Sequence, residues 1–165
     1  MHLKEKIAAD LKKALKEKKE LEALTLRMLQ ATILNKEKEK RIKLAKEKEE
    51  IKEKELADES QLADDEIIEA VSSEIKKRKE AMAEFQKGKR DDLVAKEKRE
   101  IEILQEYLPE QLSEGEIRKL AKEIIEKSGA SNLKDMGKIM RELMPKIKGR
   151  AEGSVVSRIV KELLT

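Results

Sequence analysis

Only two aromatic side chains, Phe85 and Tyr107, are available to the core of this 165-residue chain. Aromatic residues usually supply the largest buried areas in a domain, so this core has to be built from Leu, Ile, Val, Met and Ala. Two prolines and six glycines are also too few for the many chain reversals of a β-sandwich or barrel. Because Glu, Lys, Leu and Ala favour helices, we predict an all-α protein.

The chain contains no cysteine, which excludes disulfides and thiolate metal sites and fits a reducing compartment. Lys4, Glu5 and Lys6 stand where a secretory signal would be apolar, and no apolar run approaches the roughly 18 residues of a membrane span. We therefore expect a cytoplasmic protein without a membrane partner.

Few residues are suited to catalysis. The single histidine, His2, lies next to the N-terminus, and the glycine-rich phosphate motifs of nucleotide enzymes are missing from the sequence. Acidic groups at 64–66 and 91–92 stand at predicted helix starts, where caps and the helix dipole favour acids. We predict no catalytic residue, no metal site and no cofactor.

Pro109 marks a predicted boundary between two domains. Residues 1–109 should form an N-terminal helical hairpin or bundle, because apolar residues recur there at steps of three and four. Asp64 is expected to cap one of its helices.

The segment from 36 to 55 differs from the rest of this domain, since 16 of its 20 residues are charged. We expect a long, solvated helix that projects and is partly frayed. The alternative is that residues 36–56, or the N-terminal hairpin, form a docking surface for another protein. A coiled coil is disfavoured, because a heptad begun at Ile42 next places Glu49 and Lys52 on the seam.

Residues 110–165 predict a small C-terminal domain of three helices. The S-x-x-E sequence at Ser113–Glu116 is a capping box that opens the first helix, and Gly129 is expected to end it. Pro145 should kink or end the second helix one residue earlier. Ser154 is expected to cap the third helix.

Positive charge is concentrated in this C-terminal part. Residues 113–165 hold 12 Lys and Arg against 8 Asp and Glu, whereas residues 1–112 hold 27 against 28. Cations that neutralise phosphates need no aromatic platform, and glycines and a helix start let backbone amides approach an anion. The alternative is a merely solvated face. The candidate nucleic-acid-binding residues are Lys134, Lys138, Arg141, Lys146, Lys148, Gly149, Arg150, Gly153 and Ser154.

Two long strings resemble the YqeY-like family of bacterial proteins: EIKKRKEAMAEFQKGKRDDLVAKEKREIEILQEYLPEQLSEGEI and SGASNLKDMGKIMRELMPKIKGRAEGSVVSRIVKELL. The most specific pieces are YLP at 107–109, DMGKIM at 135–140 and KGRA at 148–151. The resemblance covers nearly the whole chain and is weakest across 36–62. The C-terminal part is similar to the tail domain of the B subunit of the glutamine-dependent aminoacyl-tRNA amidotransferase (GatB).

The resemblance implies two helical domains, the second a three-helix, GatB-tail-like unit. The similar tail contacts the tRNA elbow, while ammonia generation and phosphorylation of the mischarged aminoacyl-tRNA belong to parts with no counterpart here. Lys138 and the run 148–150 match tail positions. Glu152 stands where Asp or Asn is usual, and Gly153 where the subunit tends to have Pro.

Three hypotheses follow. The first is a non-catalytic protein that binds tRNA or another structured RNA and works with an aminoacyl-tRNA synthetase or an amidotransferase. The second is a helical protein–protein interaction module. The third, implied by the family resemblance alone, is a part in carbon–nitrogen ligation with glutamine as the amide nitrogen donor.

Overall fold

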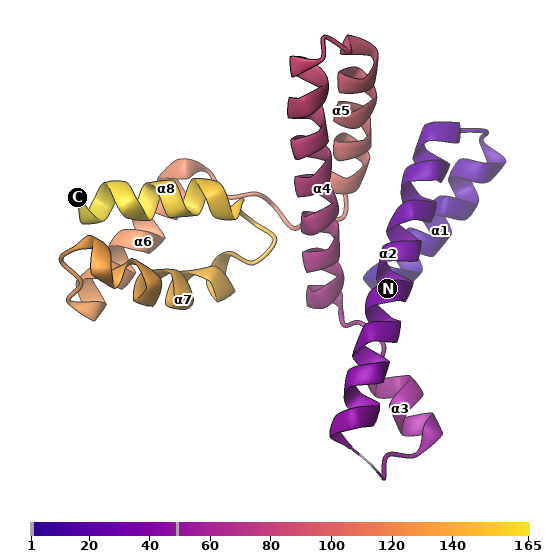
Figure 1. The fold of residues 1–165 in the computed structure, drawn as a ribbon, viewed down its shortest axis with the longest axis horizontal. Helices are drawn as coiled ribbons and strands as arrows, with labels where there is room; N and C mark the ends of the chain where they lie inside the picture. The colour runs from indigo at the N-terminus through magenta and orange to yellow at the C-terminus, as the bar shows by residue number, and fades with distance from the viewer. Residues whose placement is uncertain (1, 49) are drawn as a thin grey trace. The chain divides into compact units, whose positions relative to one another are not determined.

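The computed structural model describes residues 2–48 and 50–165, and within these ranges it contains α-helices, one short 3-10 helix and no strand. The all-α prediction is confirmed. The chain divides into two compact units, Met1–Tyr107 and Leu108–Thr165 (Figure 1). The helices of the first unit are α1 (Leu3–Lys16), α2 (Glu20–Glu47), α3 (Glu53–Glu59), α4 (Asp64–Lys87) and α5 (Asp91–Gln105). The second unit holds α6 (Glu114–Ser128), the 3-10 helix η1 (Leu133–Asp135), α7 (Met136–Ile147) and α8 (Gly153–Leu164).

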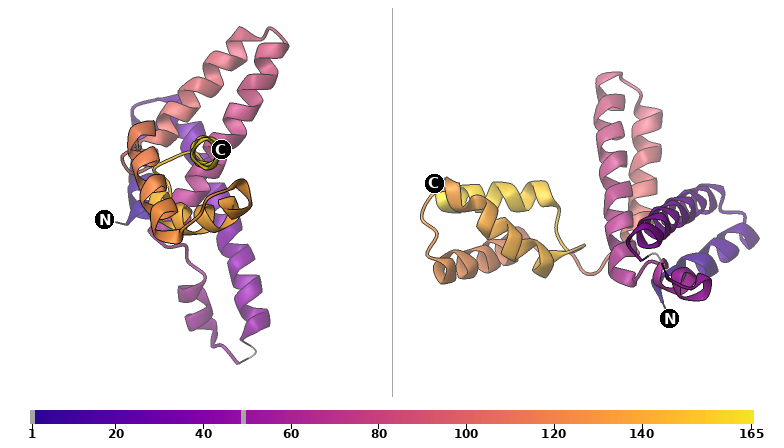
Figure 2. Two further views of the ribbon diagram at one scale, coloured as in Figure 1. Left: turned by 90° about the vertical axis from the view of Figure 1, so that its left-hand side faces the viewer. Right: turned by 60° about the horizontal axis from the view of Figure 1, so that its bottom comes forward.

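The N-terminal unit is built from two helical hairpins. In the first, Ile7 and Leu11 of α1 and Leu26 and Leu29 of α2 are buried at the spacing of one helical face. In the second, α4 packs along α5. No side chain from 79 to 99, all of which the structure describes, is buried, and this end of the hairpin extends away from α1 and α2 in both views of Figure 2.

Asp64 has a different role from the predicted one. Ala63 is the N-cap of α4, and its N–H donates to Glu66 Oε2 at 2.8 Å, so Glu66 satisfies the free backbone group. Asp64 Oδ1 instead accepts the Leu3 N–H at 2.9 Å, which ties the start of α1 to the start of α4. The Asp64 carboxylate, which the sequence predicted to cap its own helix, is thus bonded by the backbone of Leu3, 61 positions earlier in the chain.

The charged segment is not one projecting helix, as the sequence had suggested. Its first part continues α2 to Glu47, and after a turn α3 lies against the end of α2. Ion pairs join the two, from Arg41 to Glu53 and from Lys48 to Glu59, the latter at 2.6 Å. Glu49, the residue at which the predicted heptad failed, lies outside the described residues.

The C-terminal unit is a three-helix bundle. Ser113 Oγ accepts the Glu116 N–H at 3.3 Å while Glu116 Oε2 accepts the Ser113 N–H at 2.8 Å, so the predicted capping box is present. Gly129 ends α6 with φ 66°, as expected of a helix stop. The buried core consists of Ile117, Ala121, Ile124, Ile139, Leu143, Ile147, Val156, Ile159, Val160 and Leu164.

Two predicted helix bounds in this unit were wrong: the end of the second helix at Met144, which was one of two outcomes expected of Pro145, and the cap of the third helix at Ser154. α7 continues through Pro145 to Ile147. The ring removes one backbone hydrogen bond, and the continued turn offsets this cost by placing Ile147 in the core with no exposed surface. α8 begins at Gly153, with Glu152 as its N-cap, so Ser154 lies inside the helix.

A pair of glycine substitutions tests this account of α6 and α7. A Cβ at either Gly129 or Gly137 would meet nothing within 4 Å, so only the backbone decides the outcome. Gly129→Ala is expected to lower the free energy of unfolding by about 1 kcal/mol, because its φ is left-handed. Gly137→Ala should raise it by about 0.4 to 1 kcal/mol, because Gly137 lies in the first turn of α7 and alanine has less conformational freedom than glycine to lose on folding. Denaturant titration measures the free energy of unfolding of both variants. If both substitutions raise it, or both lower it, the assigned backbone roles of the two glycines are contradicted.

Candidate nucleic-acid interface

α7 has an apolar side and a cationic side. Its buried stripe recurs every four residues and is centred on Leu143, which has no exposed surface. At about 100° per residue, Lys138 and Arg141 point away from that stripe. Both are exposed, as is Lys134 in η1, just ahead of the helix. We call Lys134, Lys138 and Arg141 the α7 cationic face.

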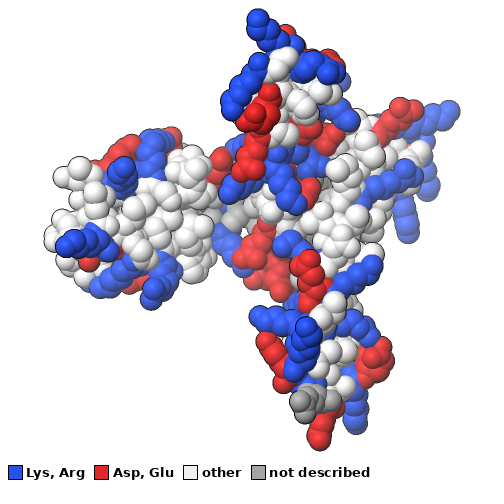
Figure 3. Space-filling view, in the orientation of Figure 1, with Lys and Arg blue, Asp and Glu red and all other residues white. Residues whose placement is uncertain are grey.

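No residue of the α7 cationic face has an ion-pair partner among the described residues. Lys138 Nζ donates to the Ser128 carbonyl at 3.3 Å, which places its charge at the C-terminal end of α6. By contrast, Arg118 of α6 and Arg158 of α8 pair with Glu162 at 2.5 and 3.0 Å. These bonds, that of Arg118 first, hold the pKa of Glu162 below its ordinary value. Cations along the side of this unit occupied by α7 are visible in Figure 3.

Lys146 is exposed but does not extend the α7 cationic face. At 100° per residue it lies about 140° around the helix from Arg141. Glu142 stands four residues from both Lys138 and Lys146 and therefore separates their ammonium groups. The six candidate cations thus occupy more than one side of the unit.

The bend between α7 and α8 is held by the segment before α6. Gly149 has φ 70°, a conformation that favours glycine, and its carbonyl accepts a bond from Gln111 Nε2 at 2.7 Å. The Leu112 N–H donates to the Arg150 carbonyl at 2.7 Å, and Arg150 Nε donates to the Glu110 carbonyl at 3.2 Å. Sequence reasoning missed these partners, because they lie about 40 positions away along the chain.

The start of α8 already carries a negative charge. Glu152 is the N-cap, and its Oε1 accepts the Ser154 hydroxyl at 3.1 Å. Lys148, in the bend, is half-buried and has a partner within the chain, and Gly153 opens the helix. A carboxylate beside the first amides weakens this helix start as an anion site. The α7 cationic face is the stronger part of the predicted interface.

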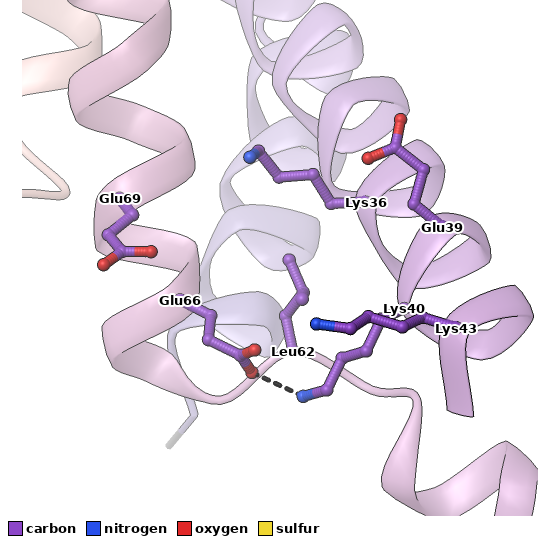
Figure 4. A pocket seen from close by; sticks show the side chains of 7 residues that line it. All are labelled: Lys36, Glu39, Lys40, Lys43, Leu62, Glu66 and Glu69. Carbon is purple, nitrogen blue, oxygen red and sulfur yellow. Dashed lines mark hydrogen bonds and ion pairs between the residues drawn. The ribbon is translucent and has the colours of Figure 1, made fainter. Parts of the chain in front are cut away.

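A hollow of about 270 Å³ lies between α2 and α4 in the N-terminal unit (Figure 4). Lys40 Nζ pairs with Glu66 Oε2 at 2.7 Å and also donates to the Gln61 carbonyl at 3.0 Å. The bond from Lys40, followed by that from the Ala63 N–H, lowers the pKa of Glu66. The charges at this hollow therefore join α2 to the start of α4, and we assign it no ligand.

A buried charge cluster at the middle of α4 was missed by the sequence analysis. Arg78 Nε donates to Glu100 Oε2 at 2.9 Å, and Arg78 Nη1 donates to Glu74 Oε2 at 2.7 Å. All three residues are at most 6% exposed. Lys77 and Thr32 also donate to Glu74 Oε1, at 2.9 and 3.3 Å. The i,i+4 spacing of Glu74 and Arg78 was visible in the sequence, but their burial was not.

The described part of the chain contains no group of three or more side chains of His, Cys, Asp or Glu that could hold a metal ion. None of the helices described there is long and apolar enough to cross a membrane.

The comparisons with known proteins agree with the resemblance seen in the sequence. A family model described as Yqey-like protein matches residues 46–164, from the end of α2 through α8. This chain belongs to the YqeY-like family. The YqeY-like chain is also 28% identical over 162 residues to "Altered inheritance of mitochondria protein 41, mitochondrial" of Pyrenophora tritici-repentis. That alignment covers 96% of this chain and 79% of the fungal protein.

Proposed function

We propose that this YqeY-like protein is a non-catalytic, cytoplasmic RNA-binding protein whose ligand is the phosphate backbone of tRNA or another structured RNA. The observation that carries the proposal is the α7 cationic face, with three exposed cations that have no ion-pair partner among the described residues. When ammonium and guanidinium groups neutralise the phosphates of a nucleic acid, the counterions condensed on that nucleic acid are released, and this release favours binding of a polyanion to such a face.

The side chains around this face favour backbone contacts over base contacts. The chain has only two aromatic residues, and Tyr107 is 5% exposed, with its hydroxyl donating to Asp10 at 2.8 Å. Stacking platforms for unpaired bases are therefore scarce, whereas a folded RNA backbone can be recognised by its shape. The similarity of the C-terminal part to the GatB tail supports tRNA in particular, together with an amidotransferase or an aminoacyl-tRNA synthetase as protein partner.

Charge reversal on the α7 cationic face tests the proposal. The variant carries Lys134→Glu, Lys138→Glu and Arg141→Glu, and tRNA affinity is measured from 50 to 300 mM salt. Each phosphate contact contributes a slope of roughly 0.7 to 0.9 in log affinity against log salt, so the slope should fall by about 2 to 3 and the affinity at least about tenfold.

A matched control places the same charge change elsewhere on the unit, with Lys119→Glu, Lys122→Glu and Lys161→Glu at exposed positions of α6 and α8. This control should keep most of the slope. Reversing Lys146 and Lys148 tests the bend separately, and Arg150 is left intact because it bonds Glu110. An unchanged slope in the α7 variant would overturn the proposal in favour of a protein-interaction module.

A further inference from the structure

The solvent side of α2 carries an uninterrupted series of positions at alternating steps of three and four residues. Leu21 is half-buried and the other seven positions are exposed, with Met28 at 46% and Ile42 at 58%. One of the eight residues is charged, in a chain whose overall charged content is 45%. We call this series the α2 seam. It consists of Leu21, Leu24, Met28, Ala31, Asn35, Lys38, Ile42 and Ala45.

A period of 3.5 residues is the signature of a helix that packs along a second helix as a coiled coil. The side of α2 that packs into its own unit is centred elsewhere, with Leu26, Leu29 and Ile33 buried. The two sides meet at Met28, whose Sδ accepts a bond from Arg78 Nη2 of α4 at 3.9 Å while the residue stays 46% exposed. The α2 seam is therefore additional to the core. In the view of Figure 3, a broad uncharged area lies over the upper part of α2.

The heptad pattern that contains Ile42 extends toward the N-terminus, whereas the sequence analysis followed it toward the C-terminus. Forward from Ile42 the pattern reaches Glu49 and Lys52, but backward it continues without a break to Leu21. At 1.5 Å per residue the α2 seam is about 36 Å long, which is long enough for a stable helix pair.

We propose that the α2 seam binds the α2 seam of a second copy of this chain, with the two helices antiparallel and related by a two-fold axis near position 33. In an antiparallel pair, each a position lies at the level of a d position of the other helix. With the axis at this place, all eight positions of the seam find a partner. The facing pairs are Leu21 with Ala45, Leu24 with Ile42, Met28 with Lys38, and Ala31 with Asn35.

The sizes of the facing side chains support this register. The large Leu21 meets the small Ala45, and the branched aliphatic side chains of Leu24 and Ile42 meet each other. The methylenes of Lys38 can lie along Met28 while the ammonium stays in water. Leu34, which is 50% exposed beside the seam, would meet its counterpart close to the axis.

Charge disfavours the parallel arrangement. Parallel helices in register would place Lys38 against Lys38, a like-charge contact inside the seam. In the antiparallel pair the nearest like charges are Arg27 and Arg41 at the edge, and Arg41 already pairs with Glu53 of its own chain. A closed two-fold pair also leaves no seam exposed for further copies.

Sedimentation equilibrium over a range of protein concentrations tests the pairing. The expected mass is twice the 19.0 kDa of one chain, falling to a single chain in the Leu24→Asp, Ile42→Asp variant. Both positions are exposed, so circular dichroism should show unchanged helix content. The matched control is Leu133→Asp with Met144→Asp, which changes exposed apolar residues of the other unit and should leave the dimer intact.

Cysteine cross-linking tests the direction, because the natural chain has no cysteine. A Leu24→Cys protein mixed with an Ile42→Cys protein should form a disulfide-linked pair. Each variant alone should stay uncross-linked, since equal positions of antiparallel copies lie about 27 Å apart. A monomer at every concentration, a dimer that survives the aspartate variant, or cross-linking of Leu24→Cys alone would each overturn the proposal. RNA binding plays no part in these readouts.

Discussion

Replacing Arg78 with alanine is expected to lower the free energy of unfolding of the N-terminal unit by about 3 to 5 kcal/mol, the usual cost of breaking a buried ion pair. The guanidinium lies between Glu74 and Glu100, and none of the three residues is more than 6% exposed. Without it, two buried carboxylates lose their compensating charge, and water cannot replace it inside the packed α4–α5 hairpin.

Fluorescence of Tyr107 measures this change, because it is the single tyrosine, lies in the N-terminal unit and is buried, and the chain has no tryptophan. The exposed pair of Lys76 and Glu80, at 4.0 Å, gives a control, since Lys76→Ala should change the stability by less than about 0.5 kcal/mol. Equal effects of the two substitutions would contradict the role of burial.

The stability difference between the wild type and Arg78→Ala should depend on pH. Burial raises the pKa of Glu74, but bonds from Lys77 and Arg78 outweigh it, so the pKa lies below its ordinary value. The wild type therefore loses this stabilisation as the pH falls through the folded-state pKa. In Arg78→Ala, the Glu74 carboxyl stays buried without the guanidinium, so its protonation becomes more favourable. The stability difference should accordingly be largest near neutral pH and shrink toward pH 4.

Leu143→Ala is expected to destabilise the C-terminal unit by about 2 to 5 kcal/mol. Leu143 has no exposed surface and lies beneath the α7 cationic face, where its removal leaves a cavity between three helices. A unit of roughly 60 residues is typically stable by only about 3 to 9 kcal/mol, so this loss removes much of its stability. Binding of tRNA should weaken as the face loses its support.

Two probes separate the units in this experiment. Circular dichroism should show a first transition at lower denaturant, whereas the Tyr107 signal should remain unchanged, because Tyr107 belongs to the other unit. Leu133→Ala, at a position 46% exposed, is the control and should change the stability by less than about 0.5 kcal/mol. A shift of the Tyr107 transition together with the first would show that the two units unfold as one.

The site shows where sequence reasoning stopped. Lys138 and Arg118 look alike in the sequence, since each is a cation on an amphipathic helix. In the structure Arg118 bonds Glu162, 44 positions away, whereas Lys138 has no ion-pair partner among the residues described. Ser154 was expected to cap α8, but Glu152 takes that position, and its carboxylate changes the charge at the helix start.

The α2 seam shows the same limit in another form. Its spacing was present in the sequence, but the buried stripe through Leu26 and Ile33 overlaps it along the same helix. Only packing shows which stripe the chain uses itself and which stays exposed.

The sequence by itself determined the all-α class, both ends of α6 and the excess of positive charge near the carboxyl end. These properties depend on residues within a few positions of one another, as the capping box at Ser113–Glu116 and the stop at Gly129 illustrate. The tertiary structure decided which charges are buried, paired or exposed, including the burial of Arg78 and the exposure of Lys138. The physical reason is that burial and ion pairing are set by groups distant in sequence, which a local pattern does not contain.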